Sequence, residues 1–115
     1  MAELRLLACF AHPDDEAFPV GGALAFHAQK GTNVRLITAT SGEEGDIRSP
    51  GIATTVTLGA IRRAELHASA NALGIQSLSV LGYRDSGMVG SGSNDRTDAF
   101  INIPGDEVVE KIVRE

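Results

Sequence analysis

Hydrophobic and polar positions follow a pattern that predicts three β-strands, each followed by an α-helix. The strands are predicted from short apolar runs, and the helices from apolar residues that recur three or four positions apart. The expected strands span residues 4–10, 33–40 and 75–81, and the expected helices span residues 22–30, 58–73 and 106–114. In the last helix, this spacing places four apolar residues on one face: Val108, Val109, Ile112 and Val113.

The alternation of strands and helices favours an α/β fold, a Rossmann-like parallel sheet with helices on both faces. Functional residues of such sheets lie at the carboxyl ends of the strands. The loops that leave those ends span residues 11–21, 41–56 and 82–104, and they hold most of the unusual residues of the chain. We therefore expect the polar chemistry at one edge of the sheet.

Composition indicates one soluble domain. The chain has 115 residues, a length that is sufficient for one hydrophobic core but not for two. Of these residues 43% are hydrophobic and 22% are charged, as in soluble globular proteins. The formal net charge is −5 without a basic cluster, so we expect no nucleic-acid partner. The first apolar run is too short for a signal peptide or a membrane helix. The single Cys9 cannot form an internal disulfide, and we expect it to lie in the hydrophobic core. We expect a cytoplasmic protein without membrane contact.

The first loop reads A-H-P-D-D-E over residues 11–16, which places a histidine and three carboxylates directly after a strand. If Pro13 opens a helical turn, His12 and Asp15 lie three positions apart and can bind one Zn²⁺ or a related divalent ion. Asp14 then points elsewhere and can take a proton from an activated water. Alternatively, the acids only cap a helix, but this leaves His12 and Pro13 unexplained.

The other two loops contain polar residues whose roles the residue chemistry leaves open. The acidic segment 40–46 either adds carboxylates to the same edge or forms a solvated turn. Arg62 either binds a polar substrate or makes a surface ion pair. Asp85 either accepts hydrogen bonds from sugar hydroxyls or holds its own loop through Arg84.

Four short segments agree in order and spacing with one known family. They are A-H-P-D-D-E at 11–16, T-S-G-E-E-G at 40–45, R-x-x-E-L at 62–66 with L-G-I at 73–75, and G-Y-R-D-S-G-M at 82–88. Through them the chain resembles the PIG-L/LmbE-like family of zinc-dependent N-acetylglucosaminyl deacetylases. The resemblance implies a metal-dependent hydrolase that removes the N-acetyl group from an N-acetylglucosamine-type sugar conjugate, a small-molecule substrate.

The resemblance also implies a role for each matching residue. It implies that His12 and Asp15 bind the zinc and that Asp14 is the general base. It further implies that Arg62 and Asp85 contact the sugar. The third zinc ligand of the family is a histidine in a later H-P-D-H-like segment, which residues 1–115 do not include.

Residues 1–115 are accordingly expected to form the N-terminal part of a single LmbE-like domain. His27 and His67 lie within predicted helices and are poor candidates for the missing ligand. Two ligands alone would hold the ion weakly. In the family, the next strand pairs beside the first one, so we expect an uncovered strand edge and a homo-oligomer.

Two further hypotheses belong to other classes. The chain could be a catalytically inactive sugar- or partner-binding module that lacks the third zinc ligand. It could also be a receiver-like signalling domain that holds Mg²⁺ with a pair of acids after the first strand. Against the latter, His12 and Pro13 precede the acids, and no phospho-acceptor Asp ends the third strand.

Overall fold

Three parallel strands form the sheet of the computed structural model, which describes residues 3–49 and 51–115. The strands lie side by side in the order β1 (Arg5–Phe10), β2 (Asn33–Thr40) and β3 (Ser77–Tyr83). The helices are α1 (Gly21–Gln29), α2 (Leu58–Leu73) and α3 (Gly105–Arg114). Two short 3₁₀ turns, Gly92–Asp95 and Phe100–Asn102, lie between β3 and α3. The prediction of an α/β fold is confirmed, although β3 begins two residues later than expected.

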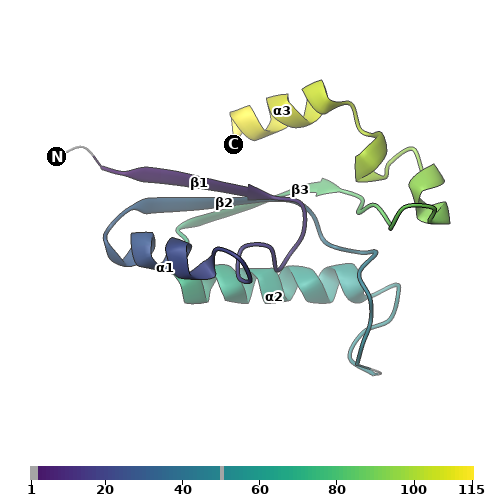
Figure 1. Ribbon diagram of the computed structural model, residues 1–115, viewed down its shortest axis with the longest axis horizontal. Coiled ribbons are helices and arrows are strands. Elements are labelled where there is room, and N and C mark those ends of the chain that lie inside the picture. The colour runs from purple at the N-terminus through teal and green to yellow at the C-terminus, as the bar shows by residue number, and fades with distance from the viewer. Residues whose placement is uncertain (1–2, 50) are drawn as a thin grey trace.

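Helices cover both faces of the sheet, as the strand–helix alternation predicts. α1 and α2 lie together below the sheet in Figure 1, and α3 lies above it. Because a parallel strand returns through a crossover helix, each strand ends at the same edge of the sheet. The arrows of all three strands in Figure 1 accordingly point in one direction.

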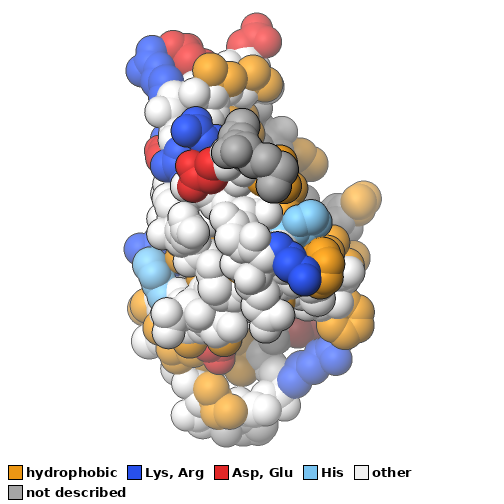
Figure 2. Space-filling model, turned by 90° about the vertical axis from the view of Figure 1, so that its left-hand side faces the viewer, with side chains coloured by type: hydrophobic (Ala, Val, Ile, Leu, Met, Phe, Trp, Pro, Cys, Tyr) orange, Lys and Arg blue, Asp and Glu red, His pale blue; other side chains and the backbone are white. Residues whose placement is uncertain are grey.

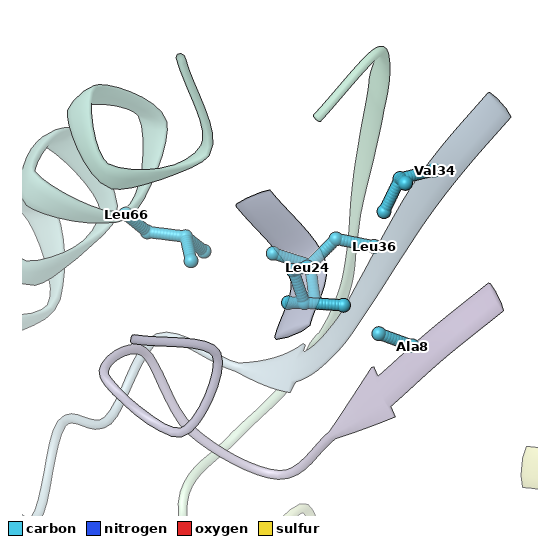
Figure 3. Close-up of a cluster of buried hydrophobic side chains, with 5 residues drawn as sticks. All are labelled: Ala8, Leu24, Val34, Leu36 and Leu66. Carbon is cyan, nitrogen blue, oxygen red and sulfur yellow. The ribbon is translucent and has the colours of Figure 1, made fainter. Parts of the chain in front are cut away.

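The main hydrophobic core lies between the sheet and the helices α1 and α2. It contains one buried residue from β1, two from β2 and one from each helix: Ala8, Val34, Leu36, Leu24 and Leu66 (Figure 3). Side chains alternate along a strand, so every second residue of β1 and β2 faces this core. The periodicity seen in the sequence therefore has a direct structural cause.

The opposite face of the sheet is covered less completely. Its buried cluster consists of Ile37, Ala39 and Leu81, against which Ile112 of α3 packs. Val109 and Val113, which share the predicted apolar face of α3, remain 60% and 78% exposed. Only part of that face is therefore buried in the described residues.

The expectation that Cys9 lies in the core is wrong. Ala8 faces α1 and α2, so its neighbours Leu7 and Cys9 face the opposite side of the sheet. Both are exposed there, because α3 packs over β2 and β3 rather than over β1.

Among the described residues, the surface at the amino ends of the strands shows no concentration of one side-chain type. Figure 2 looks onto this end, and hydrophobic side chains there are scattered among charged and polar ones.

No helix in the described part of the chain is both long and apolar enough to span a membrane.

Removing a leucine side chain from each face of the sheet should show that the two faces contribute unequally to stability. Leu36 is 1% exposed, so Leu36→Ala should lower the free energy of unfolding by about 2–5 kcal/mol through lost burial and a residual cavity. Leu7 on β1 is 53% exposed, and Leu7→Ala should cost less than about 1 kcal/mol. Urea denaturation measures both values, and equal losses would contradict the assignment of the core to one face.

Candidate active site

The three loops at the carboxyl ends of the strands meet around one pocket of about 530 Å³. The first loop contributes His12 and Asp14, the second Glu44, and the third Asp85. Arg62 reaches the same pocket from the first turns of α2. This confirms the expectation that polar chemistry gathers at one edge of the sheet.

The first loop has an irregular backbone that buried Glu16 stabilises. Asp14 has a φ of 99°, a left-handed value that costs a non-glycine residue about 1–3 kcal/mol. The side chain of Glu16 is 1% exposed and accepts a hydrogen bond from the Asp14 N–H at 3.0 Å. The first turn of α1 contains no acid, so the acids of this loop do not cap that helix. Strain of this kind is common at functional sites.

His12 is held between two carboxylates. Its Nε2 lies 2.9 Å from Asp85 Oδ1, and its backbone N–H donates to Asp15 Oδ2 at 3.0 Å. Its Nδ1 lies 3.6 Å from the same Asp15 oxygen. A carboxylate can only accept a hydrogen bond, so Asp85 favours a proton on Nε2, and the lone pair of Nδ1 then faces Asp15.

The pair of Nδ1 and Asp15 Oδ2 fits two ligands of a tetrahedral metal ion. Zinc–ligand distances of ~2.0–2.2 Å place adjacent ligand atoms roughly 3.4 Å apart, close to the 3.6 Å observed. Within residues 3–49 and 51–115, no three His, Cys, Asp or Glu side chains are grouped to hold an ion. His27 and His67 are exposed on α1 and α2. The described residues thus offer two candidate ligands, whereas hydrolytic zinc sites have three from protein.

Arg62 ties the first loop to the second. Its Nη1 donates to the Gly42 carbonyl at 2.7 Å, and its Nη2 donates to the Pro13 carbonyl at 2.6 Å. Nη2 also lies 3.3 Å from Asp14 Oδ2. Arg62 therefore lines the pocket, as expected of a substrate contact, while most of its donors already bind protein atoms.

The Asp14 carboxyl has a shifted pKa. Partial burial raises its pKa above the ordinary value, and the nearby Asp15 and Glu16 carboxylates add to the increase, whereas Arg62 opposes it. Since 72% of the Asp14 side chain is exposed, water weakens each of these effects. A carboxylate with a raised pKa is a stronger base, and this one faces the pocket.

Asp85 is 3% exposed, and protein atoms occupy both of its carboxylate oxygens. Oδ1 lies against His12, and Oδ2 accepts the Glu44 N–H at 3.0 Å. The Asp85 N–H donates to Glu43 Oε2 at 2.7 Å. Arg84 pairs mainly with the Glu44 carboxylate, at 2.6 Å. The acidic segment after β2 is therefore a connector between loops, which its sequence alone did not distinguish from a solvated turn.

Gly42 and Gly45 of this connector both lie against Arg62, and Gly42 is the more tightly constrained of the two. Its φ is 68°, and a Cβ there would lie 2.1 Å from Arg62 Nη1. Any larger residue would displace the guanidinium that binds Pro13 and Asp14.

The chain is similar to known proteins in both sequence and structure. The family model for PIG-L, the GlcNAc-PI de-N-acetylases, matches residues 7–114. The chain belongs to this family. It is 42% identical over 123 aligned positions to a 1D-myo-inositol 2-acetamido-2-deoxy-alpha-D-glucopyranoside deacetylase from Thermobispora bispora. The alignment covers 99% of this chain and 41% of that relative, so the chain spans about two-fifths of the relative's length.

The solved structures to which the chain is similar include enzymes of two kinds. The chain is similar to the N,N'-diacetylchitobiose deacetylase from Pyrococcus horikoshii, with a TM-score of 0.62 and 32% identity over 70% of this chain and 30% of that one. It is also similar to GalB, the 4-carboxy-2-hydroxymuconate hydratase from Pseudomonas putida, with a TM-score of 0.60 and 30% identity. That match covers 70% of this chain and 34% of the hydratase.

Gly42→Ala should destabilise the chain and loosen the loop around Asp14. The left-handed backbone and the displaced Arg62 together should lower the free energy of unfolding by about 1–3 kcal/mol. Gly22→Ala is the matched control, because its Cβ meets open space within α1 and alanine favours helix by up to about 1 kcal/mol. Chemical denaturation compares the variants, and a Gly42→Ala chain as stable as Gly22→Ala would contradict the close approach.

Proposed function

We propose that the chain is the N-terminal part of a single metal-dependent deacetylase domain, which removes the N-acetyl group from an N-acetylglucosamine-type sugar conjugate. The observation that carries the proposal is the placement of His12 Nδ1 beside Asp15, with Nε2 held by Asp85. Membership of the PIG-L family and the similarity to deacetylases support it.

His12 and Asp15 are the proposed ligands of Zn²⁺ or another divalent ion. The chemistry of the donor pair suits zinc, which takes imidazole nitrogen and carboxylate oxygen. When bound, such an ion supplies Lewis-acid polarisation of a carbonyl and a lower pKa for water. Asp15 is fixed for this role by the His12 N–H, which holds one of its oxygens.

Asp14 is the proposed general base. Its side chain is exposed to the pocket, and Arg62 lies 3.3 Å from its Oδ2, which limits its orientation. In the proposed reaction, an Asp14 oxygen takes a proton from the attacking water as the new C–O bond forms at the acetamide carbon. The proton can then pass to the nitrogen that leaves as an amine.

The pocket offers both polar and apolar surfaces to a sugar. Met88, Phe100 and Ile101 are among its apolar lining residues, and His12 and Arg62 are among its polar ones. A pyranose ring has apolar and hydroxylated faces, and a volume of about 530 Å³ falls in the range of small-molecule sites.

Arg62 and Asp85 remain proposed sugar contacts, with different support. Arg62 lines the pocket and retains an 18% exposed side chain. Asp85 also lines the pocket, but its two oxygens accept hydrogen bonds from His12 and the Glu44 N–H. The contacts of Asp85 support a role in holding His12 more strongly than one in binding sugar.

Two other functions have specific support. The similarity to GalB, a hydratase, favours the addition of water to a small organic molecule as the second candidate activity. The presence of only two grouped ligands in the described residues favours an inactive sugar- or partner-binding module. Acetate release distinguishes the deacetylase from both, since neither hydration nor binding produces acetate.

We also retain self-association and a cytoplasmic location as proposals. In the described sheet, β1 pairs only with β2, which leaves one edge of β1 available for pairing. Leu4 and Leu7 near this edge are 69% and 53% exposed. These features support a homo-oligomer.

Asp14→Asn should separate proton transfer from metal binding. In a zinc-supplemented protein that contains this chain together with the later segment that carries the family's third ligand, the variant should lower kcat for acetate release from an N-acetylglucosaminyl inositol by about 10²–10⁴-fold, because the amide cannot take the proton. Zinc affinity should change by less than about tenfold, since Asp14 is not a proposed ligand. Coupled acetate detection and equilibrium dialysis measure the two quantities.

Unchanged kcat in Asp14→Asn would overturn the general-base role. Sugar and zinc binding by the wild-type chain without acetate release would instead favour the binding module. Asp98→Asn is a suitable control, because Asp98 pairs with Arg96 at the exposed surface and does not line the pocket that contains His12, so its removal should leave kcat unchanged.

A further inference from the structure

Glu43 has a position that the proposed chemistry does not use. It is not among the residues that line the pocket with His12, and yet its carboxylate connects two of the loops that form that pocket. Oε1 accepts the Ser41 N–H at 2.8 Å, and Oε2 accepts the Asp85 N–H at 2.7 Å. Arg84 Nη1 lies 3.5 Å from Oε2 and compensates its charge.

The two hydrogen bonds of Glu43 have a geometric consequence for Asp85. The hydrogen bond from the Ser41 N–H fixes the Glu43 carboxylate at the end of β2. The hydrogen bond from the Asp85 N–H then fixes the backbone after β3 relative to the Glu43 carboxylate. The neighbouring Glu44 N–H binds Asp85 Oδ2, so the Asp85 side chain is held at both its backbone and its carboxylate. The other carboxylate oxygen, Asp85 Oδ1, then faces His12 Nε2 at 2.9 Å.

Orientation of His12 follows from this chain of contacts. A carboxylate that faces Nε2 stabilises the tautomer with the proton on Nε2, and it also fixes the rotation of the ring. Partners of this kind raise metal affinity about 10–100-fold in other sites, although they never touch the ion.

We propose that Glu43 and Asp85 act in series as positioning residues that hold His12 with Nε2 protonated and Nδ1 facing Asp15. The inference rests on the proposed function in that His12 is there a metal ligand. The orientation of the ring is nevertheless a property of the chain without any ion, and it can be tested separately.

The tautomer of His12 in the metal-free chain is the direct readout. Long-range ¹H–¹⁵N spectra of the histidine-labelled chain, recorded where the ring is neutral, distinguish Nε2–H from Nδ1–H. A His12→Gln variant assigns the signal among the three histidines. The wild-type chain should show Nε2–H alone.

Two variants test the series. In Asp85→Asn the amide can donate to Nε2, so His12 should shift toward the Nδ1–H tautomer, and zinc affinity by equilibrium dialysis should fall about 10–100-fold. In Glu43→Gln the amide nitrogen cannot accept either N–H, so the spectrum should show mixed tautomers, and zinc affinity should fall about tenfold. Circular dichroism checks that each variant is folded. If Glu43→Gln does not fold, the result for Asp85→Asn decides the inference.

Glu44→Gln is the matched control. It removes the same charge from the adjacent residue, whose side chain pairs with Arg84, while the backbone N–H that binds Asp85 is retained. This variant should keep the wild-type tautomer. A single Nε2–H tautomer in folded Asp85→Asn, or Nδ1–H in the wild-type chain, would overturn the inference. A wild-type chain with the expected tautomer but no zinc binding would overturn only the proposed function.

Discussion

The hydrogen bond between His12 Nε2 and Asp85 Oδ1 joins the loop after β1 to the loop after β3 across the intervening strand. The rest of the site is arranged around this contact. Glu43 holds the backbone of Asp85, and the Asp15 carboxylate lies on the other side of the imidazole. Asp85 is almost completely buried and anchors one end of this hydrogen bond, whereas 43% of the His12 side chain is exposed. The carboxylates on the two sides of the ring hold it in one orientation.

The parallel sheet makes this convergence possible. Burial of Leu36 and Leu66 between the sheet and α2 fixes the strands relative to the helix that presents Arg62. All three strands end at the same edge, so loops that are far apart in sequence meet there. Arg62 then binds the first two loops through the carbonyls of Pro13 and Gly42. The backbone strain at Asp14 is maintained by these contacts and by Glu16.

Much of the fold could be predicted from the sequence, because strand and helix periods depend on local apolar spacing. Residues 33–40 and 58–73 form the expected elements. Cys9 was misplaced because an apolar run cannot show which face of a strand a helix will cover. The A-H-P-D-D-E segment indicated His12 and Asp15 as ligands. The connecting role of Glu43 depends on two backbone N–H groups whose positions only the fold determines, and a solvated acidic turn has the same composition.

Anomalous X-ray diffraction at the zinc edge, from crystals of the chain grown with zinc, tests most directly where this site binds an ion. We predict one ion per chain within ~2.0–2.2 Å of both His12 Nδ1 and an Asp15 oxygen, with His12 Nε2 still hydrogen-bonded to Asp85. An ion bound at His27 or His67 instead, or coordination through His12 Nε2 with the Asp85 contact broken, would contradict the proposed metal site.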